Sequence, residues 1–169
     1  MKKGITRRER EITDPARILE ILERSKIVHI GMVDGDEPYV LPMNYGFTME
    51  DGKLTIYLHG ALWGRKLDII RVNPKISISM ECDVEPFEGD IACRYGISYA
   101  SLLGTGTAVI VEDVEEKKKG LSLLMKTQTG KDFTFSDKMT TMVSVIRIDI
   151  AEYTAKYRPA PGAPAMPLV

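Results

Sequence analysis

The sequence has 169 residues, 44% of them hydrophobic, and a formal net charge of −1. This length and hydrophobic content fit one globular domain with a substantial core. The near-neutral charge argues against a nucleic-acid-binding protein, and no apolar run approaches the ~20 residues of a membrane-spanning helix. Charged residues rather than an apolar segment follow residues 1–4, so no secretory signal is indicated and a cytoplasmic location is expected.

The chain is expected to begin with one helix and a three-stranded meander. The helix starts at Thr13-Asp14-Pro15, where Asp14 can cap the first turn and Pro15 fits the first helical position. Its apolar face consists of Ile18, Leu19, Ile21 and Leu22. Strands are expected at residues 26–33, 38–49 and 53–59, because tight-turn sequences at 34–36 and 51–52 separate them.

The second half of the chain carries three more expected strands and two helices. Apolar residues recur at helical spacing over 65–71 until Asn73-Pro74 ends the helix, and another helix begins at Asp113. Strands are expected at 75–81, 99–111 and 143–153, with a loop at 83–97. Six antiparallel strands with inserted helices predict an α+β fold, a small six-stranded antiparallel β-barrel with flanking helices. Residues 1–158 are expected to form this single domain, and residues 159–169 a Pro/Ala-rich tail.

Two short patterns exclude common classes of site. Gly104-Thr105-Gly106 lies inside an expected strand and lacks the third glycine of a dinucleotide-binding motif, so it predicts a bend or bulge. Cys82 and Cys93 match no zinc or redox spacing and are expected to be free thiols, so no metal site is predicted.

The clearest candidate site is the pair Arg65 and Lys66 in the first turn of an expected helix. Free N–H groups and the positive end of the helix dipole already favour an anion there, so two added cations indicate an external anion such as a phosphate. His59 and Gly60 end the preceding strand, where a ring nitrogen could donate to the ligand and a missing side chain would let it approach the backbone. The alternative is that both cations are solvated and pair with Asp68 or Glu81.

Other residues have weaker claims to a binding role. Pro42, Met43, Asn44 and Tyr45 interrupt an apolar strand, which predicts an edge strand whose free backbone groups could contact a ligand or simply face solvent. Trp63 could cap a cofactor or a subunit interface, or form a plain hydrophobic lid. His29 is expected to be a satisfied histidine within the barrel. Tyr99 and Ser101 could contact a cofactor or merely share one face of a strand.

Three segments in this order, GDEPYVLPMNYGF, LTIYLHGALWGRKLDIIRVNPKISISM and YASLLGTGTAVIVEDVEEKKKGLSLLM, resemble the FMN-binding split-barrel superfamily of pyridoxamine 5'-phosphate oxidase. The resemblance covers most of residues 10–153 and is greatest to the nitroimidazole-resistance branch. It implies a homodimer of split barrels with FMN at the interface, the strand 39–45 along the isoalloxazine ring, the Arg65-Lys66 pair at the phosphate, and Ser101 approaching from the other side. The implied cofactor-binding residues are Val40, Leu41, Pro42, Met43, Asn44, Tyr45, His59, Gly60, Gly64, Arg65, Lys66 and Ser101.

The resemblance leaves three functional hypotheses. The C-terminus, Lys156-Tyr157-Arg158 followed by 159–169, lacks the tryptophan-containing segment of the pyridoxamine phosphate oxidases, which argues against that substrate. The first hypothesis is an FMN-dependent oxidoreductase that passes electrons from a reduced nicotinamide to a small electron-poor acceptor, such as a nitroaromatic or a quinone. The second is a flavin carrier or sensor without turnover. The third is a haem- or deazaflavin-binding split barrel, with His29 or His59 as the candidate iron ligand.

Overall fold

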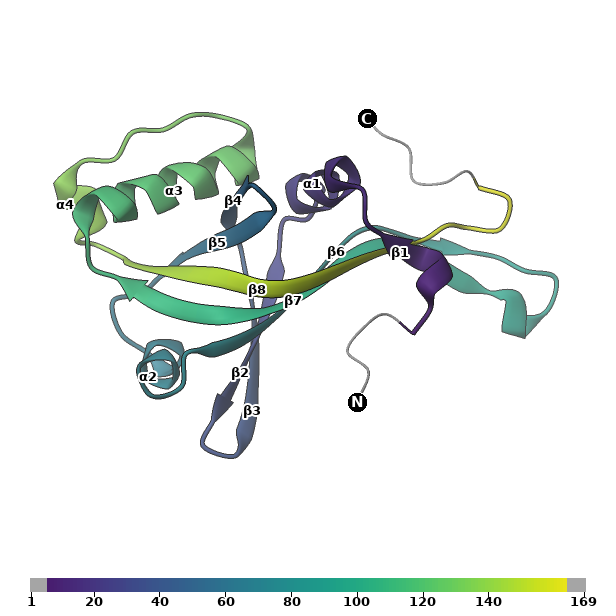
Figure 1. Ribbon diagram of the computed structural model, residues 1–169, viewed down its shortest axis with the longest axis horizontal. Coiled ribbons are helices and arrows are strands. Elements are labelled where there is room, and N and C mark those ends of the chain that lie inside the picture. Colours follow the sequence, from purple (N-terminus) through teal and green to yellow (C-terminus); the bar gives the residue numbers. More distant parts are fainter. Residues whose placement is uncertain (1–5, 164–169) are drawn as a thin grey trace.

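The computed structural model describes residues 6–163 and shows an eight-stranded antiparallel sheet with helices packed around it (Figure 1). The strands are β1 (Glu11–Ile12), β2 (Val28–Asp34), β3 (Glu37–Met43), β4 (Gly46–Glu50), β5 (Lys53–Gly60), β6 (Lys75–Phe87), β7 (Gly96–Val111) and β8 (Ser144–Arg158). The helices are α1 (Pro15–Arg24), α2 (Arg65–Val72), α3 (Val114–Thr129) and α4 (Asp137–Thr140), with short 3₁₀ helices at Arg8–Arg10 and Ala92–Arg94.

The strands follow the order β3-β2-β6-β7-β8-β5-β4, and β1 pairs with β8. The two ends of this path, β3 and β4, are consecutive in the chain, so the sheet is split between them. The predicted α+β fold with an antiparallel sheet is confirmed, as is the edge position of the strand around Pro42. The terminal residues 1–5 and 164–169, which include the expected charged N-terminus and the end of the tail, lie outside the described residues.

The predicted count of six strands is wrong for two reasons. The expected strand 38–49 is two strands, because the chain breaks at Asn44-Tyr45, where the Tyr45 side chain is fully buried. Its hydroxyl donates to the carbonyl oxygen of Leu22 (2.7 Å) at the end of α1, which draws the chain out of the sheet. The second addition, β1, has only two residues and is too short for an alternating pattern to reveal.

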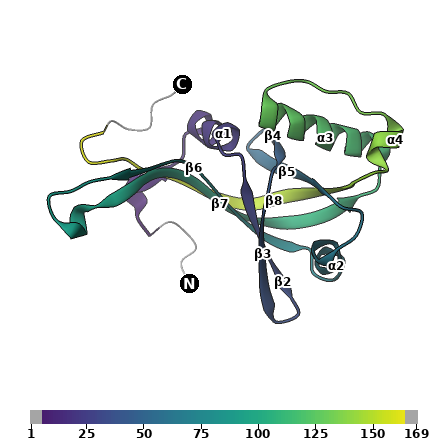
Figure 2. The same cartoon turned by 180° about the vertical axis from the view of Figure 1, so that it is seen from behind.

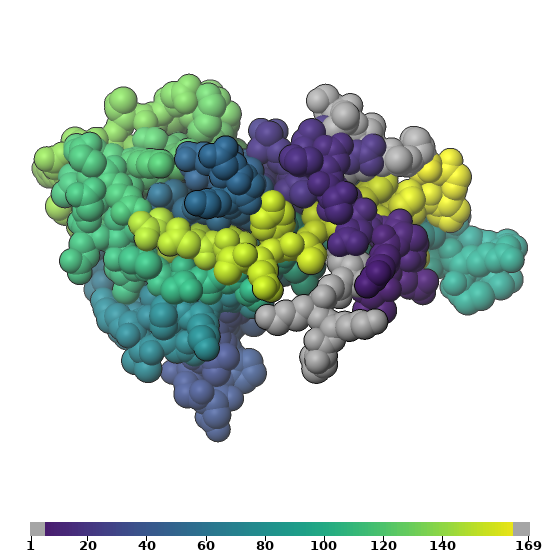
Figure 3. All heavy atoms as spheres, viewed as in Figure 1, coloured from purple at the N-terminus to yellow at the C-terminus, as the bar shows by residue number. Residues whose placement is uncertain are grey.

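Both ends of the expected loop at 83–97 are strand. β6 continues to Phe87 and β7 starts at Gly96, so the two form a long hairpin with a register shift between Cys82 and Glu85. This hairpin and the β2–β3 hairpin both project from the body of the molecule (Figure 3). Solvent reaches both faces of the projecting segment, so the apolar alternation that marks a half-buried strand is missing there.

The predicted helix starts and the predicted bulge are confirmed. The Asp14 carboxylate accepts from the N–H of Ala16 (3.0 Å), and the Asp113 carboxylate accepts from the N–H of Glu116 (2.8 Å). α3 ends at Gly130, whose φ of 73° is the left-handed conformation that closes many helices. The pairing of β7 with β8 shifts register between Thr105 and Gly106, as the Gly104-Thr105-Gly106 sequence predicts.

The main core includes residues of the sheet, α1 and α2, and α3 packs on a smaller second cluster. Figure 2 shows α1 and α3 above the sheet and α2 below it. This second cluster contains Tyr57, Val111, Leu121 and Val145. α3 also lies against β4 so closely that a Cβ on Gly46 would be 2.2 Å from the backbone nitrogen of Leu124. The first residue of β4 therefore has to be glycine for α3 to pack there.

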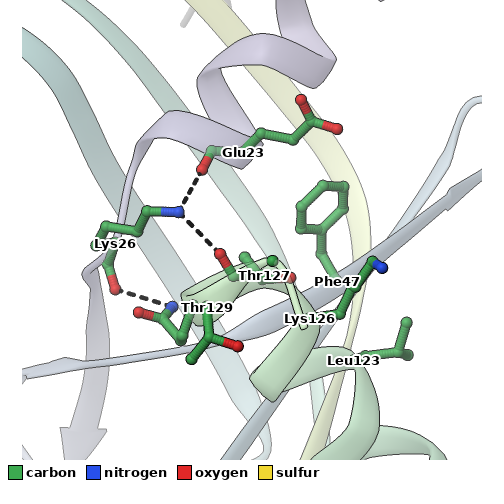
Figure 4. Close-up of a pocket in the computed structure, with 9 residues that line it drawn as sticks. Glu23, Lys26, Phe47, Leu123, Lys126, Thr127 and Thr129 are labelled. Atoms are coloured by element: carbon green, nitrogen blue, oxygen red, sulfur yellow. Dashed lines mark hydrogen bonds between the residues drawn. The ribbon is translucent and has the colours of Figure 1, made fainter. Parts of the chain in front are cut away.

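A lysine joins the C-terminal ends of α1 and α3. The Lys26 ammonium donates to the carbonyl oxygens of Glu23 and Thr127, each at 2.8 Å, across one side of a hollow between the two helices (Figure 4). Gln128 then donates to the carbonyl oxygens of Lys26 (3.2 Å) and Tyr45 (2.9 Å). Because the last carbonyls of a helix lack helical partners, these bonds fix both helix ends next to the β3–β4 break.

Candidate functional site

The structure forms a small cationic cradle where β5 ends and α2 begins, made of His59, Gly60 and Lys66. A Cβ on Gly60 would lie 2.7 Å from Nζ of Lys66, so the lysine folds back over the one position that has no side chain. Gly64 precedes α2 with a φ of 135° and offers no side-chain cap to the helix. Nζ of Lys66 therefore lies beside Gly60, at the end of the strand that precedes α2.

The histidine of this cationic cradle has a ring nitrogen without a partner among the described residues. Nδ1 of His59 is buried and bonds to none of the described residues. Burial, and after it the charge of Lys66, lowers the pKa of His59 below its ordinary value of 6.5, so the ring is neutral at neutral pH. A neutral imidazole with a free Nδ1 can donate to or accept from a polar ligand.

A serine on the neighbouring strand holds the backbone of this cradle. The Ser144 hydroxyl lies within hydrogen-bond distance of the carbonyl oxygens of Gly60 (3.3 Å) and Ala61 (2.8 Å), and Ser144 pairs with Gly60 across β8 and β5. The turn into α2 is thereby fixed at the position where a ligand would approach it.

The Arg65 side chain contacts the β2–β3 hairpin. Its Nε donates to Asp34 (2.7 Å) and its Nη2 to Glu37 (3.0 Å), while the guanidinium lies 4.7 Å from the centre of the Tyr39 ring. The hydrogen bonds to Asp34 and then Glu37 raise the pKa of Arg65.

The ion pairs that the sequence suggested for Arg65 are not formed. Asp68 instead accepts from Arg71 (2.8 Å), and Glu81 lies 3.9 Å from Nδ1 of His29. Arg65 is an ion-pair residue, as the alternative interpretation held, but its partners belong to the hairpin.

The predicted ring-contacting strand is β3, which has two distinct faces. Val40 is 63% exposed and Pro42 is also exposed, whereas Leu41 and Met43 pack against the core. Asn44 is partly buried at the break. The Tyr45 side chain belongs to the core, where burial raises its pKa, and its carbonyl oxygen accepts from Gln128.

Ser101 lies far from the cationic cradle in the same chain. It pairs with Lys156 on β8, whereas Gly60 pairs with Ser144, twelve residues back along that strand. That separation corresponds to about 40 Å of strand length. The buried Ser101 hydroxyl has no hydrogen-bond partner among the described residues, and it lines a hollow of about 610 Å³. This Ser101 hollow is also lined by Tyr99, Lys156 and Arg158.

Two further candidates from the sequence, His29 and Trp63, are both solvent-accessible. His29 was expected inside the barrel, but 39% of its side chain is exposed, because it alternates with the buried Val28 and Ile30 and so points to the outer face. Trp63 is 79% exposed on the loop before α2. The partners of Arg65 were missed altogether, because the contact between hairpin and helix is tertiary and leaves no periodic signal in the sequence.

Comparisons with known proteins identify a family for this chain. A family model described as pyridoxamine 5'-phosphate oxidase matches residues 14–157. A search of curated proteins found no match.

Solved structures share the fold over most of the chain. A proposed 5-nitroimidazole antibiotic resistance protein from Bacteroides thetaiotaomicron is 28% identical, with 87% of this chain and 86% of that chain covered and a TM-score of 0.74. A flavocytochrome from Azotobacter vinelandii is 19% identical, with 92% and 73% covered and a TM-score of 0.74. An FAD- and haem-binding protein from Mycobacterium smegmatis is 15% identical, with 94% and 77% covered and a TM-score of 0.74.

The lowered pKa of His59 predicts an acid sensitivity that is specific to this residue. Below the unfolded pKa of 6.5 the unfolded chain binds a proton that the folded chain resists, so stability falls as the pH drops through the interval between the two values. We expect His59→Gln to reduce the loss of unfolding free energy between pH 7.5 and 5.5 by at most about 1 kcal/mol, since the ring is only half-buried. Urea titrations at both pH values measure this loss. His29→Gln is the matched control, and equal losses in the parent and His59→Gln would contradict the assignment.

Proposed function

Since the chain belongs to the pyridoxamine 5'-phosphate oxidase family, we propose that it binds FMN and acts as a flavin-dependent oxidoreductase. The observation that carries the proposal is the cradle of His59, Gly60 and Lys66 at the first turn of α2. It combines a cation, an unpartnered ring nitrogen and a position without a side chain, which is a donor set suited to a phosphate. Arg65, the first residue of α2, is the second proposed phosphate ligand.

The residues of this chain would bind and orient the flavin, and the flavin would supply the redox chemistry. A flavin accepts and donates electrons, including as hydride. Lys66 and Arg65 would hold the phosphate, and His59 would bond to a phosphate or ribityl oxygen. The outer side of the edge strand β3, with Val40 and Pro42 exposed, would lie along the ring, while backbone N–H and C=O groups of residues 40–44 bond to its polar edge.

The proposed assembly is a homodimer, because one chain holds only part of the site. Ser101 and the cationic cradle lie at opposite ends of the sheet, yet the buried Ser101 hydroxyl has no partner among the described residues. A second copy could bring its own Ser101 hollow toward the flavin held by the first. The outer face near Ser101 exposes small and polar side chains that a second sheet could approach closely, including Ser77, Ser79 and Thr105.

The proposed reaction passes electrons from a reduced nicotinamide to a small electron-poor acceptor, of nitroaromatic or quinone type. We place it in the cytoplasm, because Cys82 and Cys93 are both free, as expected in a reducing compartment. None of the helices that the structure describes is long and apolar enough to span a membrane.

Removing the phosphate ligands should separate FMN from riboflavin. Lys66→Met should weaken FMN binding by about thirty-fold and Arg65→Ala by on the order of a hundred-fold, because each removes a charge-assisted contact to the phosphate. Riboflavin lacks the phosphate, so its affinity should change less than about two-fold. Fluorescence titration of apo-protein with both flavins measures the ratio. Equal weakening of both flavins would show that these residues support the fold or the ring instead.

The shared site predicts that FMN binding and dimerisation are linked. A ligand held by two chains stabilises the dimer, so light scattering on serial dilution should show dissociation at lower protein concentration with FMN than without it. A monomer that retains FMN at full occupancy would refute the interface site.

The oxidoreductase proposal predicts that NADH or NADPH bleaches the bound flavin. The reaction should be slow, because the sequence contains no dinucleotide-binding motif that would form a dedicated donor site. Stopped-flow absorbance follows it, after a visible spectrum has distinguished a flavin from haem. If neither nicotinamide nor a reduced deazaflavin bleaches the flavin, the protein is a carrier or sensor.

A further inference from the structure

The guanidinium of Arg65 is already occupied on the edge best suited to a phosphate. Nε and Nη2 lie on one side of the planar group, and together they form the side-on fork that binds a carboxylate or a phosphate through two parallel hydrogen bonds. Here the two donors bind two different carboxylates, Nε that of Asp34 (2.7 Å) and Nη2 that of Glu37 (3.0 Å). We call Arg65, Asp34 and Glu37 the hairpin clamp.

The charge of the hairpin clamp opposes a phosphate. One guanidinium and two carboxylates sum to a formal charge of −1, so a phosphate dianion that approaches Arg65 meets a group of the same sign. Lys66 compensates for one charge only. A phosphate can therefore gain the full attraction of Arg65 only if a carboxylate leaves the guanidinium.

Glu37 is the carboxylate that can leave at the smaller cost. Its side chain is 73% exposed, against 43% for Asp34, and its hydrogen bond to Arg65 is the longer of the two. Exposed ion pairs contribute little stability, because water solvates the separated charges well. The Tyr39 ring, 4.7 Å from the guanidinium, would keep the arginine in place after Glu37 departs.

The hairpin clamp connects the site to a projecting part of the fold. Asp34 and Glu37 face each other as the last pair of the β2–β3 ladder, immediately before the two-residue turn. This hairpin projects from the sheet on the side where α2 lies (Figures 1 and 2), and the clamp fastens its tip to the start of α2. A change at Arg65 is therefore transmitted to the hairpin tip.

We propose that Glu37 and the phosphate of the ligand compete for the Arg65 guanidinium, so that a phosphate-bearing flavin displaces Glu37 and releases the hairpin tip from α2. This inference rests on the proposed function and adds a residue that regulates its phosphate site. A neutral ligand such as riboflavin leaves the hairpin clamp closed. The pair Asp34 and Glu37 thus sets how strongly the site favours a phosphorylated ligand over its unphosphorylated form.

The test is a double-mutant cycle on flavin affinity. Glu37→Gln removes the competing charge, so FMN should bind about three- to five-fold more tightly, the size expected from loss of an exposed ion pair. Riboflavin affinity should stay within about two-fold of the parent. In an Arg65→Ala background, Glu37→Gln should no longer tighten FMN binding, because the guanidinium for which Glu37 and the phosphate compete is absent. Fluorescence titration of apo-protein with FMN and riboflavin gives all of these values.

The matched control is Asp36→Asn, which removes one negative charge from the same hairpin turn, next to Glu37 but outside the clamp. Any general effect of hairpin charge on FMN appears in both variants, whereas competition appears only in Glu37→Gln. Asp34→Asn, at the other clamp carboxylate, should also tighten FMN binding.

Failure of the inference and failure of the proposed function give different patterns of flavin affinity. If Arg65→Ala weakens FMN selectively but Glu37→Gln only matches Asp36→Asn, Arg65 binds phosphate without displacing Glu37 and the inference is wrong. A weaker FMN affinity in Glu37→Gln would show that Glu37 positions Arg65 for the phosphate, which also overturns it. If Arg65→Ala and Lys66→Met do not discriminate between the two flavins, the proposed function fails and the inference with it.

Discussion

The buried hydroxyl of Tyr45 is the constraint on which the arrangement of the site depends. It lies within hydrogen-bond distance of the carbonyl oxygens of Leu22 (2.7 Å) and Ser25 (3.2 Å), and so joins the break between β3 and β4 to the end of α1. Gln128 of α3 takes the carbonyl oxygen of the same residue. A buried hydroxyl or carbonyl without a partner is costly, so these bonds fix the path of the chain at this point. The break makes β3 and β4 the two edges of the sheet, so one edge of β3 stays free.

The pairing of buried polar groups also bears on the proposed ligand-binding positions. The Tyr45 hydroxyl and the Lys26 ammonium are both paired with backbone carbonyl oxygens, and these two groups support packing. His59 and Ser101 instead each have a buried polar atom without a partner among the described residues. Unsatisfied buried groups are few in native proteins, so their occurrence at two residues that the sequence had already marked is an argument for a ligand.

Local chemistry made much of the fold predictable, and tertiary contacts account for what was missed. The caps at Asp14 and Asp113, the tight turns, the bulge at Gly106 and the helix that begins at Arg65 all depend on residues close in sequence. The break at Asn44-Tyr45 depends on Leu22, far back in the chain, so an apolar run that looked continuous is divided. The projecting end of the β6–β7 hairpin carries no apolar alternation, because neither of its faces is buried.

The candidate site likewise combines local features that the sequence predicts with tertiary contacts that it does not. The cation pair at the start of α2 was visible in the sequence, but its two residues make different contacts. Lys66 lies next to Gly60, whereas Arg65 bonds to the carboxylates of the hairpin. Adjacent residues on a helix point about 100° apart, so a dipeptide motif does not by itself define one binding surface. A phosphate held by Lys66 draws on the cradle alone, whereas a phosphate held by both residues must also compete with the hairpin. The electrostatic balance at Arg65 therefore decides whether the pair acts as one site, and that balance is set by two acidic residues about thirty positions earlier in the chain.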